Sequence, residues 1–142
     1  MGSCIFCRIV AGLAPAEVLT EDDEVVVFLS LEDHPLVVPK LHVPDIYAMS
    51  EELGAAVMRQ AIRVATAVKA GLRCDGVYLA QANEPAAGQD VFHFHLHIIP
   101  RWHGDAAGYA PGTVLPGRWP RQEIRARIAG ALHASSEPGV HI

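Results

Sequence analysis

The sequence predicts an α+β fold with about five β-strands, one long helix and one short helix. Short apolar runs rich in β-branched residues recur between turn residues, which is typical of strands in one sheet. One longer stretch repeats its apolar residues at intervals of three and four, as an amphipathic helix does. With 142 residues, the chain is long enough for one domain with a sizeable core, and no second domain is expected.

The first forty residues are predicted to contain the short helix and three strands. Residues 4–12 place apolar side chains at helical spacing and end in a glycine. Two strands follow, at 17–20 and 24–29, joined by an acidic hairpin turn at 21–23. A third short strand, 35–39, lies between prolines that break regular pairing.

The long helix is predicted to run from Ser50 to about Leu72. Ser50 can accept a hydrogen bond as the N-cap, and two glutamates follow it where the helix dipole favours negative charge. A fourth strand, 75–83, starts from an Asp-Gly turn. Residues 101–120 are rich in glycine and proline and are expected to be mostly irregular, whereas 122–134 have weak helical character.

The fifth strand is predicted over Val91–Arg101, where three histidines alternate with apolar residues. With period two, His93, His95 and His97 share one face. The opposite face packs on the core through Phe92, Phe94, Leu96 and Ile98. Alternate residues lie about 6–7 Å apart, so the imidazoles are within reach of one small anion. An imidazole can bind a metal, shuttle a proton or attack phosphorus. The preceding Gly88-Gln89-Asp90 supplies a flexible backbone and an amide donor, which favours an oxyanion.

His93-Phe94-His95-Leu96-His97-Ile98-Ile99 resembles the signature of the histidine triad (HIT) family. The similarity covers about residues 3–105, and it includes Ile5-Phe6-Cys7-Arg8-Ile9, Pro39-Lys40 with His42, Asn83-Glu84 and Gly88-Gln89. The resemblance points to the zinc-carrying bacterial branch related to dinucleoside polyphosphate hydrolases. It implies a HIT-like antiparallel sheet and a homodimer. Residues 1–142 are therefore expected to form a single HIT-like domain, with an irregular segment and a variable C-terminal helix over 106–142.

The family resemblance also implies roles for individual residues. His95 would be the nucleophile, His97 would hydrogen-bond the phosphate or the departing oxygen, and His34 would lie near the nucleophile and help to set its tautomer. Gln89 and Asn83 would orient the phosphate through their amides. A purine nucleotide is the expected partner, with its base in an apolar slot formed by Ile5, Phe6, Ile9, Phe28 and Leu31.

The ribose site departs from the family pattern. Ser30 stands where relatives carry an acidic residue after Phe-Leu, and the segment between Leu31 and His34 is shorter than usual. Asp33 is the carboxylate that could substitute for the missing one. The resemblance therefore transfers the phosphate chemistry more directly than the choice of nucleoside.

A metal site is predicted from Cys4-x-x-Cys7, because a thiolate pair prefers a tetrahedral ion such as zinc. By resemblance, His42 and His93 complete the site. Four protein ligands leave no open position, so the zinc would be structural and would join the first helix to the triad strand. The alternative is a pair of buried cysteines without metal.

Composition limits the partners and the compartment. The formal net charge of −5 and the pI near 5.8 do not favour a nucleic acid polymer. No charged-then-apolar leader opens the chain and no apolar run approaches the roughly 18 residues that span a bilayer, so a cytoplasmic protein without a membrane partner is expected. Three cysteines are too few for a secreted disulfide framework.

Three functions compete on these observations. The leading one is a nucleotide hydrolase or nucleotidyl transferase that cleaves a nucleoside phosphoramidate or a dinucleoside polyphosphate through a nucleotidyl-histidine intermediate, and Gln89 favours the polyphosphate. The second is a zinc-stabilised nucleotide-binding or interaction module with reduced catalysis. The third, a hydrolase with the triad as catalytic zinc ligands, is weakened because Gln89 and Asn83 supply no carboxylate base.

Overall fold

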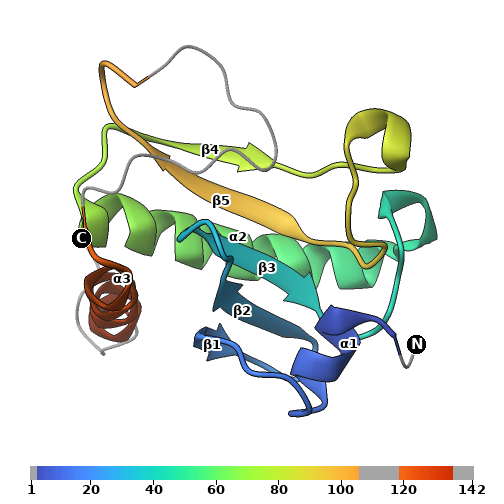
Figure 1. The fold of residues 1–142 in the computed structure, drawn as a ribbon. Helices are drawn as coiled ribbons and strands as arrows, with labels where there is room; N and C mark the ends of the chain where they lie inside the picture. Colours follow the sequence, from blue (N-terminus) through green and yellow to red (C-terminus); the bar gives the residue numbers. More distant parts are fainter. Residues whose placement is uncertain (1–2, 106–118, 136–142) are drawn as a thin grey trace.

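The computed structural model describes residues 3–105 and 119–135, which form a five-stranded antiparallel sheet with three α-helices (Figure 1). The elements are α1 (Ile5–Val10), β1 (Val18–Glu21), β2 (Val25–Leu29), β3 (Pro35–Pro39), α2 (Glu51–Leu72), β4 (Gly76–Ala80), β5 (Leu96–Arg101) and α3 (Arg121–Ser135). Two short 3-10 helices, Ile46–Ala48 and Pro85–Ala87, lie in the loops. The strand order is β1-β2-β3-β5-β4, so β1 and β4 are the edges.

The two inner strands β2 and β3 are buried at every position, because both faces of the sheet are covered. They pair in full register, from Val25 opposite Pro39 to Leu29 opposite Pro35. Val25 and Val27 pack into the large core that contains α2, while Val26 and Phe28 pack with Phe6 of α1 on the other face. The period of two in the sequence therefore separates a helix-covered face from the face that carries the functional site.

The prediction that one strand carries the whole triad is wrong, because β5 begins only at Leu96. The N–H of Phe94 donates to the carbonyl of Val43, at 2.7 Å, instead of continuing the sheet. Pairing between β3 and β5 is limited to Leu36 with His97 and Val37 with Leu96. Phe92, expected in the core, is 52% exposed as a result.

The long helix α2 is as predicted, with the Ser50 hydroxyl accepting the N–H of Leu53 at 3.1 Å. The weak C-terminal helix is present as α3 and packs against α2 through Ile124, Ile128 and Leu132, which are buried. The irregular segment expected over 101–120 lies outside the described residues from 106 to 118. Among the residues that the structure describes, no helix combines the length and apolar character needed to cross a bilayer.

Candidate functional site

The histidines of the triad do not form one row. His95 and His97 lie side by side on the wall of a cavity, with ring centroids 5.0 Å apart. His93 is fully buried and turns toward Cys4, Cys7 and His42. The short length of β5 explains this division, since the chain before Leu96 is not held in strand geometry.

His95 is held in one tautomer by the backbone. Its Nδ1 lies 2.8 Å from the carbonyl oxygen of His93, and because a carbonyl only accepts, Nδ1 carries the proton. In the neutral imidazole, the lone pair therefore lies on Nε2. The ring is 6% exposed, and Nε2 lies 3.7 Å from the Asp90 carboxylate. The backbone of the triad segment thus fixes the ring orientation and directs Nε2, the nitrogen that could act as a nucleophile, away from the His93 carbonyl.

His34 contacts His97 and not His95, which corrects the expectation that His34 sets the tautomer of the central histidine. His34 Nε2 and His97 Nδ1 are 2.9 Å apart, so one proton between them links the tautomers of both rings. Burial, reinforced by His97, lowers the pKa of His34 to about 3. Burial, reinforced by His95, lowers the pKa of His97 to about 4. Both rings are therefore neutral at pH 7.

The amides of Gln89 and Asn83 form hydrogen bonds within the protein, and the role expected of them toward a phosphate stays a prediction. Gln89 accepts the N–H of Glu84 at 2.6 Å and donates to the carbonyls of Pro44, at 2.6 Å, and Val91, at 3.1 Å. Asn83 accepts the N–H of Ile46 and forms a paired amide contact with Gln81. Both residues hold the loops beside the site.

The cavity has an apolar side and a polar side that meet at His95 and His97. All five residues predicted for the base slot line the apolar side, namely Ile5, Phe6, Ile9, Phe28 and Leu31. The polar side runs along β4 and the following loop, over 78–82 and 87–90. Glu32 and Asp90 line both sides. An extended ligand could therefore place a phosphate at the histidines, with one group on each side of them.

Glu32 and Asp90 are the site residues that the sequence analysis missed. Oε2 of Glu32 is buried and has no hydrogen-bond partner among the described residues. Burial, and secondly the charge of Asp90, raise the pKa of the Glu32 carboxyl. Asp90 could have been found from its place directly before the triad segment. For Glu32 no sequence signal was available, because the shortened loop has no counterpart in the family pattern.

Asp33, the expected replacement for the family's ribose carboxylate, is directed elsewhere. Its Oδ1 accepts a hydrogen bond from Arg121 Nη1 at 2.8 Å, and Asp33 does not line the cavity. Ser30 does line it, but its hydroxyl accepts the N–H groups of Glu32 and His34. The side chain from this loop that reaches both sides of the cavity is therefore Glu32.

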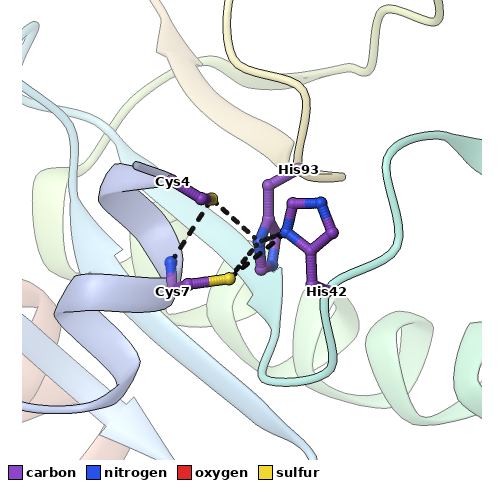
Figure 2. A group of neighbouring side chains, drawn as sticks. All are labelled: Cys4, Cys7, His42 and His93. Carbon is purple, nitrogen blue, oxygen red and sulfur yellow. Dashed lines mark hydrogen bonds between the residues drawn. The ribbon is translucent and has the colours of Figure 1, made fainter. Parts of the chain in front are cut away.

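Four side chains converge beside α1, as predicted for the metal site (Figure 2). The ligand atoms of Cys4, Cys7, His42 and His93 all lie within 4.8 Å of one another. Cys7 Sγ is 3.2 Å from His42 Nδ1, and the two Nδ1 atoms are 3.2 Å apart. A tetrahedral zinc with ordinary Zn–S and Zn–N bonds would separate its ligand atoms by about 3.3–3.8 Å. The donor set and its spacing fit a closed, structural zinc site.

The surroundings of these ligands also fit a zinc ion. His93 Nε2 lies 2.7 Å from the Pro39 carbonyl, so Nε2 carries the proton and Nδ1 faces the cysteines with a lone pair. The N–H of Cys7 donates to Cys4 Sγ at 3.4 Å, which favours a thiolate. Burial and the neighbouring Cys4 raise the pKa of the Cys7 thiol, an effect that a divalent cation between the sulfurs would reverse.

Comparisons with known sequences and structures all point to one protein family. A profile of the HIT domain matches residues 11–104. Protein hit of Bacillus subtilis is 37% identical over 140 residues, covering 94% of this chain and 97% of that protein. Adenylylsulfatase HINT3 of Arabidopsis thaliana is 35% identical over 106 residues, covering 72% of this chain and 54% of that protein.

Among solved structures, a Zn-bound histidine triad family protein from Mycobacterium smegmatis superposes with a TM-score of 0.82. It is 34% identical, and the match covers 96% of this chain and 99% of that one. The HIT-like fold expected from the sequence is thereby confirmed. Signature, fold and alignment together show that the chain belongs to the HIT domain family, the histidine triad proteins.

Proposed function

We propose that this protein hydrolyses a nucleoside phosphoramidate through a nucleotidyl-histidine intermediate on His95. The observation that carries the proposal is the tautomer of His95. Its Nδ1–H donates to the His93 carbonyl, with 2.8 Å between nitrogen and oxygen, which leaves Nε2 as the nitrogen for attack where the apolar and polar sides of the cavity meet. An activated nucleophile beside two distinct subsites suits a displacement at phosphorus.

In the proposed reaction, Nε2 of His95 attacks phosphorus and the bond between phosphorus and the leaving nitrogen breaks. The departing amine takes up a proton from solvent, and the later attack of water on phosphorus returns one to solvent. The proposed reaction needs the tautomer in which His34 Nε2 carries the shared proton, because His97 then presents Nε2–H to the phosphate and stabilises its growing negative charge. Water then cleaves the N–P bond, which releases a nucleoside monophosphate and restores neutral His95.

The polar side of the cavity supports an amine over a polyphosphate as the leaving group. Its described lining includes Glu32 and Asp90 and contains neither lysine nor arginine. A polyphosphate leaving group carries several negative charges and would be repelled there, whereas a neutral or cationic amine would not. Gln89, which favoured a polyphosphate on sequence grounds, has its amide engaged in loop contacts.

The apolar side of the cavity suits a flat purine base. Phe6 is nearly buried, and its ring meets that of Phe28 edge to face at a centroid distance of 5.5 Å. Phe6 also contacts the His95 ring edge to face, at 5.1 Å. A base stacked in this slot would place its 5′-phosphate at the two histidines.

We also propose that the chain forms a homodimer through the β4 edge and the adjoining surface of α2. Leu79 on β4 is 45% exposed, and Met58 and Ile62 on α2 are 48% and 61% exposed. An exposed sheet edge beside apolar side chains is a common site of self-association. Light scattering at micromolar concentration should give the mass of two chains, and a monomer mass would contradict this proposal.

The proposed reaction is tested by His95→Asn against His103→Asn, a matched change at an exposed histidine outside the cavity. Turnover of adenosine 5′-phosphoramidate should fall by at least about a thousandfold in His95→Asn while adenosine monophosphate affinity stays within a few-fold. His103→Asn should behave like the parent.

Two further measurements separate this function from its competitors. Rapid quenching of the parent should trap an acid-labile nucleotidyl adduct on His95, and diadenosine polyphosphates should be poor substrates. Ordinary turnover by His95→Asn, or binding without any adduct in the parent, would contradict the mechanism and favour the binding module.

A further inference from the structure

The loop Ser30–His34, which forms one wall of the cavity, is a tight turn closed by its own hydrogen bonds. The N–H of Ser30 donates to the His34 carbonyl at 2.8 Å, and the N–H of Asp33 donates to the Ser30 carbonyl at 3.1 Å. The Ser30 hydroxyl accepts the N–H of Glu32, at 3.1 Å, and of His34, at 3.3 Å. This turn sets where Leu31 and Glu32 lie along the cavity.

The turn is bonded to a residue almost ninety positions further along the chain. Arg121, the first residue of α3, donates through Nη1 to the Ser30 carbonyl at 2.7 Å and to Asp33 Oδ1 at 2.8 Å. The two side chains are 35% and 37% exposed, so the ion pair is partly shielded from water. Asp33 has φ of 68°, a left-handed conformation that aspartate tolerates better than most residues. Arg121 therefore holds the turn at the residue with the least common backbone conformation.

The helix that carries Arg121 is itself fixed to the core. Ile124 and Ile128 are buried between α3 and the rest of the large core. The guanidinium of Arg127 lies over the Trp119 ring, 3.6 Å from its centroid. Because α3 packs on α2, Arg121 ties the cavity loop to a helix that is fixed to the core (Figure 1).

We infer that Arg121 and Asp33 are positioning residues, through which the C-terminal helix α3 fixes the loop Ser30–His34 and so tunes ligand affinity at the cavity. This inference rests on the proposed function, because the affinity concerned is for a nucleotide at His95 and His97. The contact between Arg121 and Asp33 acts on Leu31 and Glu32, which line the cavity, and not on His95, whose orientation comes from the His93 carbonyl. His34, the last residue of the loop, is fully buried directly before β3 and is held there independently of Arg121. Loss of the contact should therefore change binding and leave the chemical step nearly unchanged.

The test uses Arg121→Ala, Arg121→Lys and Asp33→Asn in the full chain, with Arg125→Ala as the matched control. Arg125 lies on the same helix and pairs with Glu17 at 3.0 Å, away from the cavity loop. Asparagine keeps the tolerance for positive φ, so Asp33→Asn removes charge without adding strain. The readouts are the Kd of adenosine monophosphate, KM and kcat for adenosine 5′-phosphoramidate, and amide hydrogen exchange of Glu32, Asp33 and His34.

Loss of a partly exposed ion pair is expected to change a dissociation constant by up to about fivefold. We expect Arg121→Ala to raise Kd and KM by about three- to fivefold with kcat within twofold, and to speed exchange of the three loop amides. Arg121→Lys should restore most of the affinity. The Arg121→Ala/Asp33→Asn double variant should equal Arg121→Ala, because both changes break the same contact. Arg125→Ala should match the parent in every readout.

Equal Kd and KM in Arg121→Ala and Arg125→Ala, or a fall in kcat as large as the rise in KM, would overturn the inference. Additive effects of the two single changes would overturn it as well. A parent that neither binds adenosine monophosphate nor turns over the phosphoramidate would refute the proposed function instead. Hydrogen exchange of the loop amides would then test the contact between Arg121 and Asp33 by itself. Faster exchange in Arg121→Ala but not in Arg125→Ala would support the contact, and equal exchange in both would refute it.

Discussion

Single residues at the cavity owe their protonation and orientation to contacts with the backbone or with one another. His95 is oriented by a carbonyl two residues away, and His34 and His97 share one proton in a buried pair. Asp90 is the opposite case, since its side chain is 80% exposed and lies at the mouth of the site. The buried histidines can determine the reaction at phosphorus, whereas the exposed Asp90 carboxylate can only favour some ligands over others by their charge.

Asp90 is predicted to favour phosphoramidates whose leaving amine carries a positive charge. In Asp90→Asn, the ratio of kcat/KM for a cationic over a neutral leaving amine should fall by about two- to fivefold, because the carboxylate is exposed and partly screened. Glu84→Gln, at an exposed glutamate in the neighbouring loop that does not line the cavity, is the control and should leave the ratio unchanged. An unchanged ratio in Asp90→Asn would show that Asp90 does not select the leaving group.

The buried pair His34 and His97 is predicted to make stability depend on pH. Their pKa values in the folded protein, about 3 and about 4, lie below the value of about 6.5 in an unfolded chain. The unfolded state therefore binds more protons between pH 6.5 and about 4, and the free energy of unfolding falls as the pH is lowered through this window. Each histidine can contribute up to about 1.4 kcal/mol per pH unit.

Urea unfolding of the parent and of His34→Gln across this range checks the prediction. The variant should show a shallower decline, and the zinc ligands, common to both proteins, cancel in the comparison. Equal slopes would mean that His34 is not held neutral by burial.

At the scale of elements, the contact between α2 and α3 depends on a close approach at Gly71. A Cβ at this position would lie 2.6 Å from the carbonyl oxygen of Arg127, whereas a Cβ at Gly54, in the same helix, would lie 3.7 Å from Met49 Sδ. Alanine within a helix normally stabilises by about 1 kcal/mol relative to glycine. Alanine at Gly54 and alanine at Gly71 are therefore expected to change the free energy of unfolding in opposite directions.

Gly54→Ala should raise the free energy of unfolding by about 0.5–1 kcal/mol. Gly71→Ala should lower it by about 1–3 kcal/mol, because α3 must move away from α2 to avoid the clash. Chemical denaturation of both variants measures this. A stabilised Gly71→Ala would show that the two helices can separate at little cost.

For the whole molecule, the zinc site joins three segments that are distant in sequence. It links α1 through Cys4 and Cys7, the loop after β3 through His42, and the chain before β5 through His93. The same segments carry Phe6 and His95 to the cavity wall. Metal binding is therefore expected to stabilise both the fold and the site geometry.

Metal analysis should find near one zinc per chain. The Cys4→Ser/Cys7→Ser double change should remove it and lower the free energy of unfolding by about 4 kcal/mol or more, in the range typical of a lost metal site. Cys74→Ala is the control, since Cys74 is buried outside the cluster and should leave the zinc content intact. Unchanged metal content and stability in the double variant would exclude the predicted ligands.

Local sequence determined the elements of this protein and the identity of the residues that meet at its sites. The β-branched runs of β2 and β3 and the capped stripe of α2 follow from patterns that neighbouring residues share, whereas the apolar base slot was implied by the family resemblance. The zinc ligands were identified because their residue types and motif are recognisable before folding. The catalytic roles, the homodimer, the single-domain boundary, the cytoplasmic location and the lack of a nucleic-acid partner remain predictions.

Only the tertiary structure decided how these residues are divided and connected. Phe94 forms a hydrogen bond with Val43 and His93 with Pro39, so His93 and His95 lie outside the sheet and only His97 is in strand β5. The amides of Gln89 and Asn83 are used by loop backbone, and Arg121 reaches Asp33 from the other end of the chain. Each of these outcomes is a hydrogen bond to a partner distant in sequence. Such a partner is chosen by how the elements pack, and no local periodicity encodes it.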